Sequence, residues 1–255
     1  MACYNSENTI HKCIDSILNQ SFVDFEFIIV DDASTDSTGQ ILNGFAQQDD
    51  RIKVLKNQNN EGLAYSLNFA FQKSKGYLIA RMDADDVAFP YRLEKQVKCF
   101  NNNHELSVLG SAAVFCSNAQ DSSNNMLVKM PQTHTEIIRF MYKSAPFIHP
   151  TVMMKRDFFQ IVGGYDKKLR RAQDYDMWLR GRDIGSFKNL EEELMYYSYD
   201  KKKSYQAIFS TFIIKIKSRP NLKELGIAVF YSSYEVCKLI RYSYKKIRRK
   251  NRFME

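Results

Sequence analysis

"YLIARMDADDVAFP", residues 77–90, is the stretch on which the interpretation of this chain turns. An apolar run ends there in three carboxylates within four residues, Asp83, Asp85 and Asp86. Like charges this close repel each other, and aspartate is a poor strand former, so something must compensate for their proximity. A bound metal ion, the start of a helix or exposure to water would each do so.

The sequence around this stretch alternates between short apolar runs and amphipathic runs. Strands are predicted over 25–30, 52–55, 77–81 and 107–116, and helices over 7–20, 61–74, 90–101 and around Ile41, Leu42 and Phe45. This alternation favours an α/β fold with a doubly wound, mostly parallel sheet. Ligands of such sheets bind beyond the carboxyl ends of the strands. The acidic residues at 31–32 and 83–86 directly follow predicted strands, so both groups are expected at the ligand-binding edge.

Two carboxylates spaced i and i+2 in a turn, as Asp83 and Asp85 are, can converge on one hard cation, with phosphate oxygens completing its shell. Such an ion would also remove the repulsion. The residue types alone leave open a solvated turn with helix-capping acids. At "DDAS" (31–34), a loop with a helix cap competes with a carboxylate that accepts hydrogen bonds from a nucleobase or ribose.

Three further positions are candidates for binding or catalysis. Gly62, in "NNEGLAYSLN" (59–68), would let a ligand approach the backbone. His149 precedes a proline and is either a turn residue or a contact for a phosphate or metal. Asp174 lies near the start of an amphipathic helix within 163–180, where a carboxylate partly shielded from water can act as a general base.

Charge divides the 255 residues into two parts. Residues 200–255 hold 15 Lys/Arg against 4 Asp/Glu, a net charge of +11, which leaves −3 for residues 1–199. We therefore expect a catalytic domain over 1–199 and a basic amphipathic helical tail over 200–255. The tail would pack on the domain or lie on an anionic membrane surface; no nucleic-acid motif accompanies its charge, and nucleic acid is not an expected partner.

The cysteines and hydropathy point to a cytoplasmic protein. Five scattered cysteines, an odd number without metal-ligand spacing, indicate reduced thiols. Neither a signal peptide nor an uncharged apolar run of about 18 residues is recognisable in the sequence. With the basic tail, this predicts a peripheral location on the cytoplasmic face of the cell membrane.

An ordered set of motifs over roughly residues 1–199 resembles inverting glycosyltransferases of family 2, which have the A-type, nucleotide-sugar-binding α/β fold. The motifs are "YNSE" (4–7), "SILNQSF" (16–22), "FIIVDDASTDST" (27–38), "NEGLAYSLN" (60–68), "YLIARMDADD" (77–86), "HPTVM" (149–153) and "GGYDKKLRRAQDYDMWLR" (163–180). The resemblance implies transfer of a hexosyl or related sugar from a UDP- or dTDP-type donor. The acceptor hydroxyl would belong to a lipid-linked or cell-surface polysaccharide intermediate.

The resemblance also implies roles for individual residues. Tyr4 and Asp32 would flank the base, with Asp32 facing the ring nitrogen of uracil or thymine. Asp83 would contact the ribose, and Asp85, with Asp83, would hold Mg²⁺ or Mn²⁺ at the diphosphate. Asp174 would deprotonate the acceptor, so that a single in-line displacement inverts the anomeric carbon. Independently of the resemblance, Gly62 is a candidate to adjoin the donor, and His149 is a further candidate metal ligand.

The chain departs from the family pattern at three points. Gln173 stands where Glu usually precedes the catalytic aspartate, and Ala33 replaces a usual glycine, which we expect to be a small change. The family's first strand should precede "ACYN" (2–5), and none is recognisable there. The sequence therefore predicts a sheet without a central strand, through a late start or a truncation.

Two alternatives of other classes stay open at this point. "DADDV" (83–87) also satisfies the Asp-x-Asp-x-Val pattern of haloacid-dehalogenase-type phosphatases, in which the first Asp is a nucleophile. That family, however, carries the motif near its start. The other alternative is an inactive sugar-nucleotide-binding or membrane scaffold protein.

Overall fold

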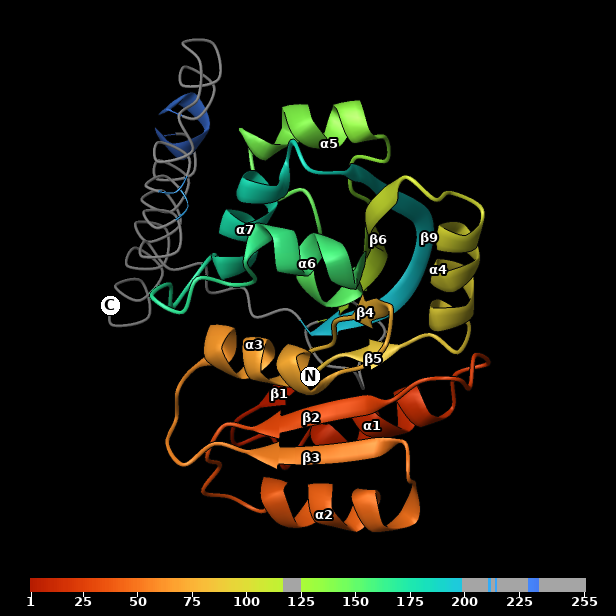
Figure 1. Ribbon diagram of the computed structural model, residues 1–255, viewed down its shortest axis with the longest axis vertical. Coiled ribbons are helices and arrows are strands. Elements are labelled where there is room, and N and C mark those ends of the chain that lie inside the picture. Colours follow the sequence, from red (N-terminus) through yellow and green to blue (C-terminus); the bar gives the residue numbers. More distant parts are fainter. Residues whose placement is uncertain (117–124, 199–210, 212–213, 215–228, 234–255) are drawn as a thin grey trace, which may run out of the picture.

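The computed structural model describes residues 1–116, 125–198, 211, 214 and 229–233. Strands and helices alternate along it, as the sequence predicts, and form two sheets flanked by helices (Figure 1). The element boundaries differ from the predicted ones by a few residues at most, because helix ends depend on tertiary contacts.

The N-terminal half is a parallel sheet with the strand order β1-β2-β3. Its strands are β1 (Ala2–Cys3), β2 (Phe27–Asp31) and β3 (Ile52–Lys56), and its helices are α1 (Ile10–Leu18), α2 (Thr38–Gln48) and α3 (Leu63–Lys73). Every residue of β2 is buried. Burial on both faces explains why this strand is apolar throughout rather than alternating.

Successive side chains of β2 pack into two different hydrophobic clusters, one on each face of the sheet. Ile29 packs with Ile14 of α1 and Leu42 of α2, whereas Ile28 and its second neighbour Val30 pack with Ala70 of α3. Helices therefore cover both faces of the sheet, which is the doubly wound arrangement. The polar loops that follow the strands are left at the carboxyl edge, where they form the site described below.

The second sheet has the order β4-β8-β6-β9-β5, with β7 added to β6. It is built from β4 (Leu78–Ala80), β5 (Val87–Ala88), β6 (Leu106–Cys116), β7 (Met126–Val128), β8 (Met153–Lys155) and β9 (Ser186–Ser198). Of the strand pairs described in this sheet, β6–β9 is parallel and the others are antiparallel. The sequence predicted mostly parallel pairing throughout, and the second half of the fold differs from that prediction. Strands such as β4 and β8 are far apart in sequence, and their pairing is not encoded in local periodicity.

Helices α4 (Arg92–Asn101), α5 (His134–Met141), α6 (Arg156–Val162) and α7 (Gln173–Gly181) and the 3₁₀ turn η2 (His149–Thr151) accompany this sheet. Trp178 of α7 is fully buried against Phe147 and Phe158. Met177 and Leu179 belong to the same buried cluster as Trp178. This core fixes the N-terminal end of α7, where Asp174 lies.

An apolar groove of about 670 Å³ separates the edges of β2 and β4. The opening residues, expected to be loop, form the short strand β1, which pairs with Val30 and Asp31 and touches Asp83 through one parallel bridge. The amino group of Met1 is buried and donates to the carbonyl of Ile28 at 2.9 Å. The short strand β1 reaches only the carboxyl end of β2.

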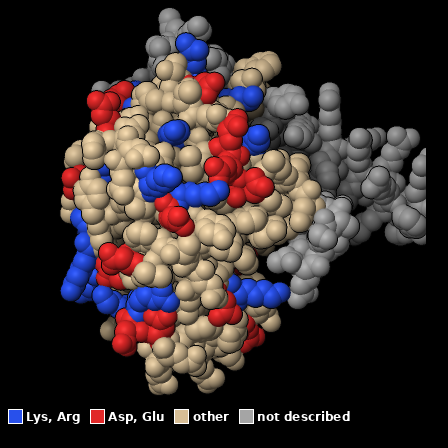
Figure 2. Space-filling view, turned by 90° about the vertical axis from the view of Figure 1, so that its right-hand side faces the viewer, with Lys and Arg blue, Asp and Glu red and all other residues tan. Residues whose placement is uncertain are grey.

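Most of the predicted tail helix lies outside the described residues. Ile214 is buried in the same cluster as Trp178, and the Nζ of Lys143 lies 5.0 Å from the ring centroid of Tyr231, so these points of the tail contact the domain. Among the described residues, no helix is both long and apolar enough to cross a membrane. Figure 2 shows Lys/Arg and Asp/Glu side chains interspersed over one face of the domain.

Candidate active site

Three strand ends meet at the carboxyl edge of the parallel sheet. Cys3 of β1 lies opposite Asp31 of β2, and Ala2 bridges to Asp83, which follows β4. Tyr4, the next residue after β1, is 47% exposed. The structure therefore brings the two acidic groups and Tyr4 to one edge, where the sequence placed them.

Asp32 is 4% exposed and organises the loop that leads into α3. Its Oδ1 accepts hydrogen bonds from Asn57 Nδ2 at 2.6 Å and the Glu61 amide at 2.9 Å, and its Oδ2 accepts from the Gly62 amide at 2.8 Å. Gly62 has φ of +90°, a conformation that side-chain-bearing residues rarely adopt. Asp32 thus holds the glycine loop against the site, and Asn57, which the sequence analysis missed, helps to fix it.

Asp31 and Ala33 shape the turn after β2. The Oδ1 of Asp31 accepts from the Ser34 amide at 2.9 Å, while its buried Oδ2 has no partner among the residues that the structure describes. Ala33 has φ of +62°, in the left-handed region. A Cβ atom there costs roughly 1–2 kcal/mol, so replacing the family's glycine is a larger change than we expected.

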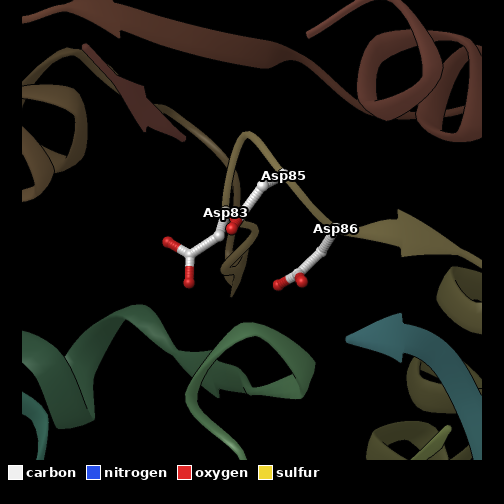
Figure 3. Close-up of side chains that lie close together, drawn as sticks. All are labelled: Asp83, Asp85 and Asp86. Atoms are coloured by element: carbon white, nitrogen blue, oxygen red, sulfur yellow. The ribbon is translucent and has the colours of Figure 1, made fainter. Parts of the chain in front are cut away.

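The turn between β4 and β5 gathers the three carboxylates. Asp83, Asp85 and Asp86 each offer an oxygen, and these oxygens lie within 4.8 Å of one another. Figure 3 shows the carboxyl groups of Asp83 and Asp86 directed to the same side of the turn. Asp85 is exposed, whereas Asp86 is 1% exposed.

Asp86 is the most perturbed of the three. Its Oδ1 accepts from the Ser198 amide at 2.8 Å, and its buried Oδ2 has no partner in the part of the chain that the structure describes. Burial, and then the charge of Asp83, raise the pKa of Asp86 to about 8. A hard divalent cation suits this set, because it takes oxygen ligands, would satisfy the orphaned oxygen and would offset the crowded charge. The residues present therefore fit Mg²⁺ or Mn²⁺.

Arg81, which the sequence analysis missed, partly compensates for the same charge. Its Nη1 and Nη2 donate to Oδ2 and Oδ1 of Asp83 in a two-bonded ion pair. The two residues stand only two positions apart and carry opposite charges, and this spacing was the available signal. A second buried arginine, Arg92, donates to the carbonyl of Arg81 at 2.7 Å and fixes the backbone there.

Asp174 lies in the first turn of α7 and is half-buried. Burial raises its pKa above the ordinary value, and the charge of Asp83 acts in the same direction. Its neighbour Gln173 is 7% exposed, and the Oε1 of Gln173 has no hydrogen-bond partner within the residues described. Asp176, in contrast, accepts from Arg180 Nε at 2.8 Å, which leaves Asp174 as the less engaged carboxylate of this turn.

His149 does not join the carboxylate group. Its Nε2 lies 2.8 Å from the hydroxyl of Tyr165, a residue that the sequence analysis also missed. Burial, and then the charge of Arg81, lower the pKa of His149 well below its ordinary value, so the ring is neutral. The backbone of Tyr165 is held by Asn68, whose side chain bonds both its N–H and its carbonyl. The geometry thus favours a structural turn at His149 over metal ligation.

The comparison with protein families is decisive. The model of "Glycosyl transferase family 2" matches residues 1–162. The chain belongs to glycosyltransferase family 2. This membership confirms the resemblance inferred from the motifs and decides against the phosphatase alternative.

Two family 2 relatives illustrate the match. The putative glycosyltransferase EpsE of Bacillus subtilis is 38% identical over 199 residues, which cover 76% of this chain and 69% of EpsE. The O-antigen biosynthesis glycosyltransferase WbnJ of Escherichia coli is 31% identical over 246 residues, which cover 94% of both chains.

Solved structures show the same fold at lower identity. S. aureus TarS 1-349 in complex with UDP-GlcNAc superposes with a TM-score of 0.67 at 19% identity, covering 90% of this chain and 69% of TarS. The mannosyltransferase PcManGT from Pyrobaculum calidifontis, in complex with GDP-Man and Mn²⁺, gives 0.66 at 16% identity, covering 91% and 67%. The expected A-type α/β fold of this family 2 member is confirmed.

Proposed function

We propose that this family 2 member transfers a hexosyl or related sugar, with inversion, from a UDP- or dTDP-type donor to an acceptor hydroxyl in polysaccharide synthesis. The observation that carries the proposal is the group of three carboxylates within 4.8 Å of one another. The half-buried Asp174, whose raised pKa is influenced by the charge of Asp83, supports it. The name of WbnJ supports a polysaccharide product, and the ligand of TarS supports a UDP-type donor.

The strand ends would bind the nucleoside. Tyr4 is exposed beside the end of β2, where its ring can stack on a base. Asp32 holds the Gly62 loop and has an unused acceptor lone pair on Oδ2, with which it would accept from the ring N–H of uracil or thymine. The absence of a side chain at Gly62 leaves its backbone open to the donor.

The carboxylate turn would bind the diphosphate. Asp83 and Asp85 would hold Mg²⁺ or Mn²⁺, with the orphaned oxygen of Asp86 beside them. When bound, such an ion stabilises the negative charge of the departing nucleoside diphosphate. PcManGT, which was solved with Mn²⁺, supports a metal in a protein of this fold.

Asp174 would act as the general base. Its raised pKa makes it a stronger base than a solvated aspartate, and it would take the proton of the acceptor hydroxyl as the oxygen attacks. Attack on the side of the sugar opposite the leaving diphosphate inverts the anomeric carbon in one displacement. Gln173 in place of the family's glutamate removes one negative charge beside this base, so the acceptor or the rate would differ from those of Glu-bearing relatives.

The proposed location is the cytoplasmic face of the cell membrane. The tail over 200–255 carries a net charge of +11, which would attract an anionic lipid surface. A lipid-linked acceptor would then be presented at the same surface. Attachment through the tail leaves the site residues, all before residue 180, on the domain.

Calorimetric titration of UDP, dTDP and GDP with and without Mn²⁺ tests the proposed function. We expect Mn²⁺-dependent binding of UDP or dTDP that Asp85→Ala abolishes, while the variant melts as the parent does. Asp50→Ala, a change of an exposed aspartate in the loop before β3, is the matched control and should bind normally. Unchanged, metal-dependent affinity in Asp85→Ala would refute the metal assignment.

A further inference from the structure

The side chain of Arg81 is buried among the residues that the proposed function uses. It is 3% exposed, whereas that of its partner Asp83 is 27% exposed. Both terminal nitrogens of Arg81 donate to Asp83, and its buried Nε has no hydrogen-bond partner among the described residues. Arginine stays charged in proteins, so this positive charge is permanent and poorly screened by water.

Arg81 lies where its charge acts on the rest of the site. It lowers the pKa of both His149 and Asp174, in the same direction as burial at His149 and against the effect of burial at Asp174, so its field reaches the proposed base. The other ionisable groups that it influences include Asp85, Asp86 and Tyr165, and the charge of Arg92 is also near. Asp83 is the only one of these groups that forms a described hydrogen bond with the guanidinium.

The ion pair conflicts with a cation at Asp83. A divalent ion on the carboxylate turn would lie beside a guanidinium that can neither lose its proton nor reach bulk water. The two cations would repel each other and would compete for the same carboxylate oxygens. The repulsion is offset only if further negative charge enters the site together with the ion.

We propose that Arg81 is a built-in counter-ion for Asp83 that weakens the binding of a divalent cation on its own and thereby makes cation binding depend on the diphosphate of the donor. This inference rests on the proposed function. The diphosphate supplies the compensating negative charge and accepts hydrogen bonds from Arg81 as the cation takes Asp83. Because binding linkage is reciprocal, the cation strengthens nucleotide binding by the same factor. The site would then assemble only when both are present.

Removing the charge of Arg81 should make the binding of Mn²⁺ and the binding of UDP less dependent on each other. We expect Arg81→Met to bind Mn²⁺ alone about tenfold or more tightly than the parent, since a unit charge a few ångströms away is removed. The factor by which Mn²⁺ strengthens UDP binding should fall by a similar amount. A purely structural role of Arg81 would instead weaken both ligands.

The test is isothermal titration of Mn²⁺ with and without UDP, and of UDP with and without Mn²⁺. Arg51→Met is the matched control, because Arg51 also forms a two-bonded pair with an aspartate two positions away, Asp49, at the opposite end of β3 from the site. It should leave both affinities and their coupling unchanged. Equal or weaker Mn²⁺ binding by Arg81→Met would overturn the proposal.

Two further variants keep the proposal testable if Arg81→Met does not fold. Arg81→Lys keeps the charge and should retain weak Mn²⁺ binding and strong coupling, whereas Arg81→Gln should behave as Arg81→Met. The same affinities in Lys and Gln variants would also overturn the proposal. If the parent protein binds neither Mn²⁺ nor any of the three nucleotides, the proposed function fails; if it binds both and the neutral variants change nothing, the role of Arg81 alone fails.

Discussion

The backbone N–H of Ser198 donates a hydrogen bond of 2.8 Å to Oδ1 of Asp86, although 112 positions separate the two residues. This bond ties the carboxylate turn to the last residue of β9, immediately before the basic tail. The innermost carboxylate is thus held by the end of the domain rather than by its own turn. Its position depends on the completed fold, and so do its electrostatics.

The raised pKa of Asp86 makes the stability of the folded protein depend on pH. Its pKa is about 8 in the folded chain, raised by burial and then by Asp83, against an ordinary value of 3.8. Between these values the folded state binds a proton that the unfolded state has lost, so stability falls as pH rises toward 8. In EDTA, we expect the melting temperature to fall between pH 5 and pH 8. Asp86→Asn should flatten this slope, and thermal melts across the range would measure it; an equal slope in the variant would assign it to another group.

Asp174→Asn tests the general base. The amide keeps the shape of the side chain but cannot accept the proton, so we expect a loss of transfer rate of about 10²-fold or more with donor binding nearly intact. Asp176→Asn, which breaks the pair with Arg180, is the control and should keep most activity. Because burial raises the pKa of Asp174, transfer by the parent should decline with falling pH at a higher pH than for a solvated aspartate. Wild-type-like transfer by Asp174→Asn would show that another group is the base.

Ala33→Gly should stabilise the protein. The residue has φ of +62°, and glycine adopts this conformation without the Cβ clash. We expect a gain of about 1 kcal/mol, or roughly 2–4 °C in melting temperature. Ala46→Gly within α2 should have the opposite sign, because glycine costs about 1 kcal/mol in a helix. A lower melting temperature of Ala33→Gly would mean that the alanine methyl group makes compensating contacts.

Filling the groove between β2 and β4 should also raise stability. β1 pairs with only the last two of the five residues of β2, and the groove beside the others is lined by apolar side chains such as Phe27, Leu78 and Met153. An added valine- and isoleucine-rich strand ahead of Met1 would pair with both edges and bury apolar surface. We expect this extended variant to melt higher than one with a Gly/Ser extension of equal length. Equal melting temperatures would indicate that the groove does not accept a strand.

The basic tail should bind anionic membranes. Each Lys or Arg near such a surface adds on the order of 1 kcal/mol, and the interleaved aromatic and aliphatic residues add insertion that salt does not screen. Deleting residues 222–255 keeps the buried contact of Ile214 and should release the protein from anionic vesicles without abolishing donor hydrolysis. Co-sedimentation at low and high salt measures this. Full-length protein that stays in the supernatant at low salt would favour a tail that only packs on the domain.

Much of the fold was accessible from local sequence patterns. The apolar run over residues 25–30 predicted the strand β2, and the apolar periodicity within residues 7–20 predicted the helix α1, because a buried strand or helix face leaves a recognisable pattern of apolar residues in the sequence. The antiparallel pairing of β4 with β8 was not accessible. It joins residues 78–80 to 153–155, and a register between such distant segments is set by the packing of the whole core.

The same division holds for the candidate site. The sequence by itself determined the family, through ordered motifs, and determined that Asp83, Asp85 and Asp174 stand where strand or helix ends expose them, because such ends are set locally. Only the tertiary structure decided that Arg81 pairs with Asp83, that Asp86 is the buried carboxylate and that His149 bonds Tyr165 instead of joining the carboxylate turn. The burial of Asp86 and the bond of His149 depend on partners from other parts of the chain, whereas the pairing of the near neighbours Arg81 and Asp83 depends on the desolvated position of the guanidinium. Burial and long-range pairing are properties of the folded whole, and they do not appear in residue order alone.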